Sequence, residues 1–199
     1  MNLNDLYWPE RLAINISELV GNDICAKVMA GSETLADASP KSRRAWLTEA
    51  MARLEELVPD RDTRSLILTR CSCMPSDAIL AEFREMYERN PDIDALLTRM
   101  HPRPFGVRPI RLGNTIRFRK MPCEPTALEF ATSEQARREA FCHCDFVRDI
   151  PGEIPPMHCQ CGAGFYKNIL EAVLRRPVKV ELVKSVLKGD DTCEVLVRL

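Results

Sequence analysis

The sequence predicts an α+β protein, in which a helical N-terminal half precedes an antiparallel β-sheet with packed helices in the C-terminal half. Over the first hundred residues, apolar side chains recur at helical spacing, whereas later stretches alternate apolar and polar residues as strands do. The 199 residues, 45% of them hydrophobic, are enough for a sizeable core. We expect a mainly helical region over residues 1–104 and a cysteine-rich α+β region over residues 105–199, packed as one compact unit.

The helices of the first half are predicted from caps as well as from periodicity. One helical face of RRAWLTEAMARLEEL carries Trp46, Ala50 and Leu54, and Ser39 with Pro40 supplies a cap and a first turn. Further helices are expected through TRSLILTR, SDAILAEFREMYER and DIDALLTRM. Two shorter helices are predicted in the opening segment PERLAINISELVGNDICAKVMAG, and its central glycine divides them.

The strand signals lie in the second half. A hairpin is predicted by IRLGNTIRFRK, which alternates around Gly113 and Asn114. A second hairpin at the C-terminus is predicted by VKVELVKSVL, the turn KGDD and CEVLVRL. A further strand is expected through REAFCHCDFV, although a helix could equally begin in the overlapping SEQARREAF. Between these strands a helix is expected in GFYKNILEAVLRR, ending at Pro177.

Charge and hydropathy limit the classes of partner. Lys and Arg total 28 against 29 Asp and Glu, so neither nucleic acid nor a membrane surface is expected as a partner. No apolar run approaches the roughly 20 residues of a membrane span, and the N-terminus lacks the pattern of a signal peptide. We therefore expect a cytoplasmic protein. The choice between a monomer and a homodimer stays open.

The cysteines are the most informative residues. There are nine, and six of them form the Cys-X-Cys pairs 71/73, 142/144 and 159/161. Because the cytoplasm keeps thiols reduced, metal binding or redox chemistry explains such pairing better than a disulfide network. Cys25, on an apolar helix face, is expected to fill the core, and Cys123 is expected to be structural.

Two of the pairs predict a zinc site. On a strand, Cys142 and Cys144 would point to the same face. Cys159 and Cys161 lie at a helix start, where the dipole favours thiolate. Four thiolates so placed could close a tetrahedral zinc site with Zn–S distances of about 2.3 Å.

Other interpretations of the cysteines stay open. An iron–sulfur cluster is the alternative metal centre, while buried structural thiols and a reactive thiol are the alternatives without metal. Further candidate metal ligands are Cys71, Cys73, His158, Glu181 and Cys193, with His101 as another nitrogen donor.

The C-terminal run HCQCGAGFYKNILEAVLRRPVKVELVKSVLKGDDTCEVLVRL resembles the end of the 4-vinyl reductase domain. The matching residues are Gly162, Gly164, Phe165, Arg176–Val178, Glu181, Gly189, Asp190 and Cys193. The chain is similar also to 2-amino-thiazoline carboxylate hydrolase-like proteins. The resemblance implies an antiparallel sheet packed on helices, a pocket for a small hydrophobic ligand, and zinc ligands at Glu181 and Cys193. At the place of a third cysteine ligand, this chain has Lys184 or Ser185.

Two classes of function follow. The first is a zinc-binding protein that binds or senses a small molecule, and the alternative is a zinc- or thiol-dependent enzyme, a hydrolase or reductase, acting on a small organic substrate. A closed four-thiolate shell favours the first, and an open coordination position favours the second. We expect an apolar pocket, whose wall would be formed by Phe141, Phe146, Phe165 and Tyr166, although these aromatic side chains could equally fill the core.

Overall fold

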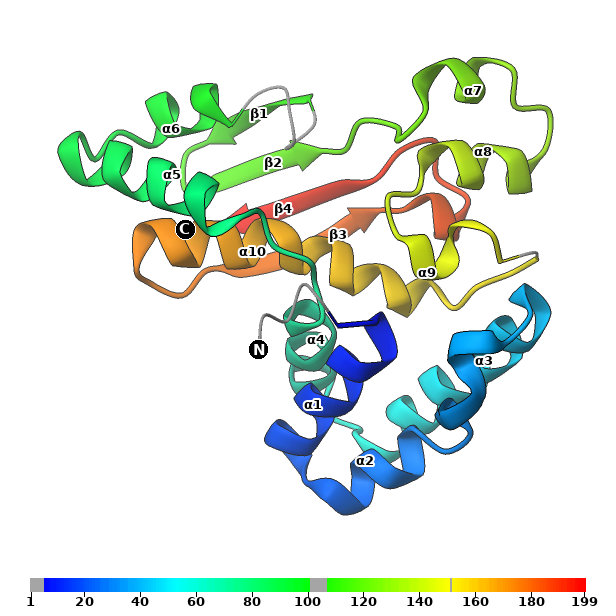
Figure 1. Ribbon diagram of the computed structural model, residues 1–199. Coiled ribbons are helices and arrows are strands. Elements are labelled where there is room, and N and C mark those ends of the chain that lie inside the picture. The colour runs from blue at the N-terminus through cyan, green and yellow to red at the C-terminus, as the bar shows by residue number, and fades with distance from the viewer. Residues whose placement is uncertain (1–5, 101–106, 151) are drawn as a thin grey trace.

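A computed structural model describes residues 6–100, 107–150 and 152–199 (Figure 1). Its first half is helical, as predicted, and the predicted cap is confirmed, because Ser39 Oγ accepts from the Ser42 amide. The helix after Asp60 has a cap as well, since the Asp60 carboxylate accepts from the Thr63 amide. Gly21, with φ of 97°, divides the first two helices. The elements are α1 (Trp8–Val20), α2 (Asn22–Val28), η2 (Ser32–Asp37), α3 (Pro40–Leu57), α4 (Arg61–Arg70), α5 (Asp77–Arg89) and α6 (Ile93–Arg99).

The sheet has four antiparallel strands in the order β1-β2-β4-β3 within the described ranges. Both predicted hairpins are confirmed, as β1 with β2 and as β3 with β4. The strands are β1 (Val107–Leu112), β2 (Thr115–Arg119), β3 (Lys179–Lys184) and β4 (Glu194–Arg198). In β2 the side chains of Ile116 and Phe118 are buried, whereas those of Arg117 and Arg119 are exposed, so one face of the sheet is packed and the other is solvated.

The helix α10 (Gln160–Leu174) packs against β3 and β4 on the buried side of the sheet (Figure 1). It also packs on α4, where a Cβ atom added at Gly164 would collide with the backbone carbonyl of Thr69. A glycine is therefore required at that crossing. The helices α5 and α6 flank one end of the sheet, and the α1–α4 region lies on the far side of α10 (Figure 1).

The predicted strand through residues 138–147 is wrong. This part of the chain forms α8 (Glu134–Phe141) and α9 (Asp145–Arg148), with Cys142 to Cys144 in the link between them. The physical reason is local, because Ser133 Oγ accepts from the Ala136 amide and caps α8. The short remaining elements are α7 (Pro125–Glu129), η3 (Pro156–Cys159) and η4 (Val186–Lys188).

Two hydrophobic clusters form the interior. The first joins α1, α3 and α4 to Phe146, Val147, Ile150 and Ile154, and the second joins the sheet and α10 to α5 and α6. Neither cluster is confined to one side of residue 104. Cys144 and Cys161 pack against the first cluster and Cys159 against the second, so the cysteine pairs lie where the two clusters meet.

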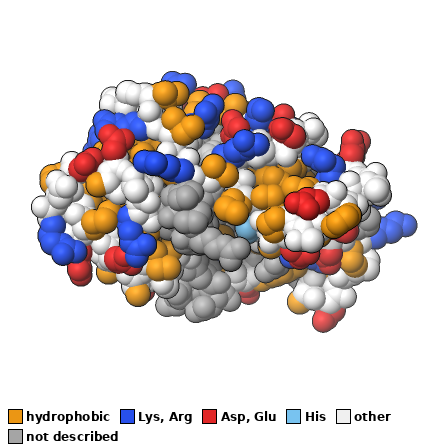
Figure 2. Space-filling view, turned by 90° about the horizontal axis from the view of Figure 1, so that it is seen from above, with side chains coloured by type: hydrophobic (Ala, Val, Ile, Leu, Met, Phe, Trp, Pro, Cys, Tyr) orange, Lys and Arg blue, Asp and Glu red, His pale blue; other side chains and the backbone are white. Residues whose placement is uncertain are grey.

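The surface seen from above Figure 1 carries charges of both signs. Figure 2 shows Lys and Arg side chains interspersed with Asp and Glu, and hydrophobic side chains between them. In the described ranges, no helix is long and apolar enough to cross a membrane.

Candidate thiol site

Five cysteines from three parts of the chain gather near the end of β2. We call these five, with Lys120, the thiol site: Cys142, Cys144, Cys159, Cys161, Cys193 and Lys120. The first pair lies between α8 and α9, the second at the start of α10, and Cys193 directly before β4. Burial raises the pKa of the Cys142 thiol to about 12, and the neighbouring thiols of Cys159 and Cys193 add to the increase. The thiols are therefore close enough to act on one another.

One side of the thiol site is organised by Ser185. This side chain is fully buried, and its Oγ donates to Cys159 Sγ at 3.0 Å while accepting from the Leu187 amide at 3.1 Å. Burial raises the pKa of the Cys193 thiol, and the nearby Ser185 hydroxyl lowers it in part. The sequence analysis mentioned Ser185 only because it occupies the place of a third cysteine ligand. In the structure, this residue lies between two thiols.

The other side of the site is formed by Cys144, Cys161 and His158. The Cys144 Sγ atom lies 3.6 Å from His158 Nε2. Burial and, to a lesser degree, the Arg11 guanidinium lower the pKa of His158 to about 3, so the imidazole is neutral at physiological pH. The exposed Cys73 borders this side, because its thiol raises the pKa values of Cys144 and Cys161, adding to the larger effect of burial.

Burial, and not the helix dipole, decides the ionisation of the thiols. It raises the pKa of Cys159 to about 12 and raises that of Cys161 as well. The expectation that the start of α10 lowers these pKa values is therefore wrong, since desolvation disfavours the thiolate more than the dipole favours it. Without a bound cation, the thiols carry protons at neutral pH.

Lys120 is the residue of the site that sequence reasoning missed. Burial lowers the pKa of its ammonium, but Tyr166 and the thiols of Cys193, Cys159 and Cys161 more than offset this, so that the pKa is raised. A Cβ atom at Gly162 would lie 2.8 Å from Lys120 Nζ, so a glycine leaves room for the ammonium at the start of α10.

A sequence signal for Lys120 existed. In the predicted hairpin IRLGNTIRFRK, Ile116, Phe118 and Lys120 are every second residue and so point to one face of the sheet, and the first two are fully buried. The alternation therefore directs the lysine side chain inward.

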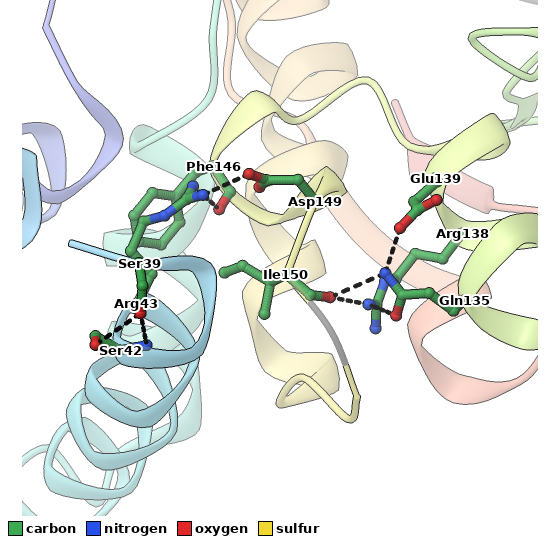
Figure 3. A network of polar contacts seen from close by, with 9 residues as sticks. All are labelled: Ser39, Ser42, Arg43, Gln135, Arg138, Glu139, Phe146, Asp149 and Ile150. Atoms are coloured by element: carbon green, nitrogen blue, oxygen red, sulfur yellow. Dashed lines mark hydrogen bonds and ion pairs between the residues drawn. The ribbon is translucent and has the colours of Figure 1, made fainter. Parts of the chain in front are cut away.

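Two arginines bind the segment that directly follows Cys144 (Figure 3). Arg43 of α3 donates to Asp149 Oδ2 at 2.5 Å and to the Phe146 carbonyl at 3.3 Å. Arg138 of α8 donates to the Ile150 carbonyl and to Gln135. The segment that follows Cys144 is thus tied to α3 through Arg43 and to α8 through Arg138.

Several candidate ligands lie away from the thiol site or on its border. Glu181 is exposed and pairs with Arg198 at 3.3 Å. Cys71, at the end of α4, is fully buried and donates to the Ile67 carbonyl at 3.2 Å. Cys25 donates to the Ala13 carbonyl at 3.2 Å. His101 lies outside the described residues.

The thiols do not stand in a ready metal geometry. Within residues 6–100, 107–150 and 152–199, no group of three His, Cys, Asp or Glu side chains is arranged to hold a metal ion. Metal binding would require side-chain rotation. The link between α8 and α9 and the first turn of α10 are the places where the four paired thiols would turn.

A hollow of about 480 Å³ lies beside the site. Its wall includes Gln160, the residue between Cys159 and Cys161, and Met157, which lies two residues before Cys159. Most of its lining is charged, namely Glu55, Arg61, Asp62, Arg64, Lys179, Glu181, Lys188 and Arg198. Phe141, Phe146 and Tyr166 are buried in the core and do not line this hollow. A small hydrophobic ligand stays a prediction that this hollow does not support.

Comparison with known proteins adds a family match without an activity. A model described as a family of unknown function, DUF6144, matches residues 128–199. A comparison with curated proteins found no match, and a comparison with solved structures found none. The family match spans most of the thiol site, Lys120 excepted. The resemblance to the 4-vinyl reductase domain stays a prediction.

Proposed function

We propose that this protein binds a thiophilic metal ion, with zinc as the first choice, through Cys142, Cys144, Cys159 and Cys161. The observation that carries the proposal is the gathering of five thiols from three parts of the chain around one lysine. Thiolate sulfur is a preferred ligand of zinc, and four thiolates complete a tetrahedral shell. Cys193 and the neutral His158 are reserve ligands beside these four.

The raised pKa values favour a metal site over a free nucleophile. A reactive cysteine needs a lowered pKa, whereas burial raises the pKa values of Cys142, Cys144, Cys159 and Cys161. A metal ion can displace the thiol protons that water cannot remove at neutral pH. An iron–sulfur cluster uses the same ligands and differs by its colour.

A closed four-thiolate shell makes the protein a binding or sensing module. Such a shell has no open position for a substrate or a catalytic water, and this disfavours the enzyme alternative. The charged hollow adjoins the shell through Gln160, the residue between Cys159 and Cys161. A small polar ligand there would contact the same turn of α10 that holds the metal, which links ligand binding to the metal site.

Metal content and stability test the proposal. Protein purified under reducing conditions without a histidine tag should hold about one zinc per chain; less than about a tenth of an equivalent would exclude the site. Zinc at about 100 times its Kd should stabilise the reduced metal-free protein by about 2.7 kcal/mol. Cys142→Ser and Cys161→Ser should lose that stabilisation. The matched control Cys25→Ser should keep it, because Cys25 bonds the Ala13 carbonyl away from the site.

A further inference from the structure

The strand β3 forms an open edge of the sheet. It pairs with β4 on one side, and within residues 6–100, 107–150 and 152–199 no strand pairs with its other side. Figure 1 shows this edge on the side of the sheet where the α1–α4 region lies. The hollow of about 480 Å³ lies along it, because residues 179–182 of β3 line the hollow together with residues of α4. The edge of β3 therefore faces a space that another segment of chain could enter.

The hydrogen-bond ladder indicates which backbone groups of β3 point outward. The Lys120 amide donates to the Cys193 carbonyl at 3.0 Å, and bonded pairs alternate along antiparallel strands. Odd-numbered residues of β4 therefore bond towards β2, and even-numbered residues bond towards β3. Because Glu181 is paired with an even-numbered residue of β4, its neighbours Val180 and Leu182 direct their amide and carbonyl groups to the open edge.

These outward groups of Val180 and Leu182 are available for pairing. The amide of Val178, two residues before Val180, already donates to the Glu171 carboxylate at 3.0 Å. In the described part of the chain, no such partner meets the outward groups of Val180 and Leu182. Both residues line the hollow, so backbone donors and acceptors of one strand face the space beside it.

The rim of the hollow carries an excess of positive charge. Five Lys or Arg and three Asp or Glu side chains line it. Two of the acidic side chains, those of Glu55 and Glu181, are paired with arginines. Asp62 remains, against three cations that make no ion pair within the described ranges: Arg61, Lys179 and Lys188. The rim is therefore complementary to a negatively charged partner.

The floor of the hollow is apolar. It includes Met157, Val180 and Leu182, and the two β3 side chains point to the packed face of the sheet. A strand added to β3 would place every second side chain on that face and the alternate ones on the solvated face, beside Lys179. The site therefore suits a segment in which apolar and acidic residues alternate.

We propose that the open edge of β3 binds an extended acidic peptide segment, in which apolar and acidic side chains alternate, as an additional strand of the sheet. Main-chain hydrogen bonds to Val180 and Leu182 supply the affinity in this mode of recognition, and the side chains supply the specificity. The cations of the rim select an acidic partner. This inference goes beyond the proposed metal site, because it involves no cysteine and needs no metal.

Fluorescence anisotropy with the reduced, metal-free full-length protein tests the preference for an acidic segment. The probe is a capped, fluorescein-labelled octapeptide of alternating glutamate and valine, and the comparison peptide has lysine in place of every glutamate. The glutamate peptide should bind at least about 10-fold more tightly than the lysine peptide. No binding of the glutamate peptide, or equal binding of the two, overturns the inference and leaves the proposed metal site untouched.

Two N-methylated peptides test whether the bound peptide forms a strand. One carries an N-methyl group on every valine and the other on every glutamate, so each lacks the amide donors along one edge. Only one of these edges can pair with β3, and the peptide methylated there should lose at least about 10-fold in affinity, while the other should keep it. If both bind as the unmodified peptide does, or both lose affinity equally, strand addition is wrong.

Variants of the rim test the place of binding. Arg61→Gln and Lys188→Gln should each weaken binding of the glutamate peptide about 2- to 5-fold, as loss of an exposed ion pair does. The matched control is Lys27→Gln, at an exposed lysine of α2 that does not line the hollow, and it should bind as the wild type does. Melting temperatures show whether each variant folds. If both rim variants bind as the control does, the peptide binds elsewhere and the inference is overturned.

A small anion is the competing explanation for the positive rim. Citrate and phosphate are therefore titrated separately against the bound glutamate peptide, with sodium chloride at matched ionic strength as the reference. Neither should displace the peptide better than the chloride does. If one of them displaces it at a concentration at least about 10-fold lower, the hollow is a small-anion site and strand addition is wrong.

Discussion

The two ends of α10 contrast in how completely the protein fills their surroundings. Toward the C-terminus, Ile169, Leu170 and Val173 are buried in the second hydrophobic cluster, against the sheet and α5. At the N-terminus, Cys159 and Cys161 face other protonated thiols, Lys120 and a group of buried donors without acceptors. The comparison teaches that one end is stabilised by packing alone, whereas the other leaves buried donors without acceptors in the described part of the chain.

Leu170→Ala should have the largest effect on stability and should test the packed end. Its side chain is fully buried, and removing it leaves a cavity that costs about 2–5 kcal/mol. Denaturant unfolding of the reduced protein gives the free energy, with and without zinc. The loss should be equal in both conditions. Phe130→Ala, at a side chain that is 77% exposed, should change stability by about 0.5 kcal/mol or less. A loss that depended on zinc would show that the two ends are not independent.

Acid should destabilise the N-terminal end of α10 in the metal-free protein. The pKa of His158 is lowered from 6.5 to about 3, chiefly by burial, so its stabilising contribution is full above pH 6.5. That contribution falls as the pH drops toward 3. At pH 5 the loss should be about 2 kcal/mol, measured as the free energy of unfolding from pH 7 to 5. His158→Gln should flatten this dependence.

The control for the acid prediction is His143→Gln. The His143 side chain is exposed and hydrogen-bonds the Met121 carbonyl at 2.8 Å. This variant should keep the pH dependence of the wild type. If His158→Gln loses as much stability between pH 7 and 5 as the wild type does, other groups cause the pH dependence. The contrast between the two ends of α10 would then be weaker.

The helices of the first half and the first hairpin were predictable because their signals are local. Ser39, Asp60 and Ser76 cap the helices that follow them, and the turn at Gly113, with φ of 60°, gives the register of the first hairpin. Each of these features depends on a few neighbouring residues. The helices of the first half and both hairpins therefore follow from the sequence.

The thiol site was only partly predictable, because its arrangement depends on distant partners. The cap at Ser133 competes with the alternation around Cys142, and the sequence cannot weigh a helix against a strand without knowing what packs there. The pKa values at Cys159 depend on burial, which the helix dipole does not indicate. Arg11 lies about 150 residues from Cys161 in the chain, and no local pattern relates the two.

The smallest effect is expected at Glu181, which the resemblance to the 4-vinyl reductase domain implies as a zinc ligand. Its carboxylate is exposed and pairs with Arg198 at 3.3 Å, on the hollow rather than among the thiols. Because an exposed ion pair is worth about 0–1 kcal/mol, Glu181→Gln should change the free energy of unfolding by no more than that. Zinc content should stay at the wild-type level. The control for altering this strand is Val183→Gln, two residues farther along β3, where the side chain is 42% exposed. If Glu181→Gln loses zinc while Val183→Gln keeps it, the metal site lies at the terminal hairpin. The proposed site at the start of α10 would then be wrong.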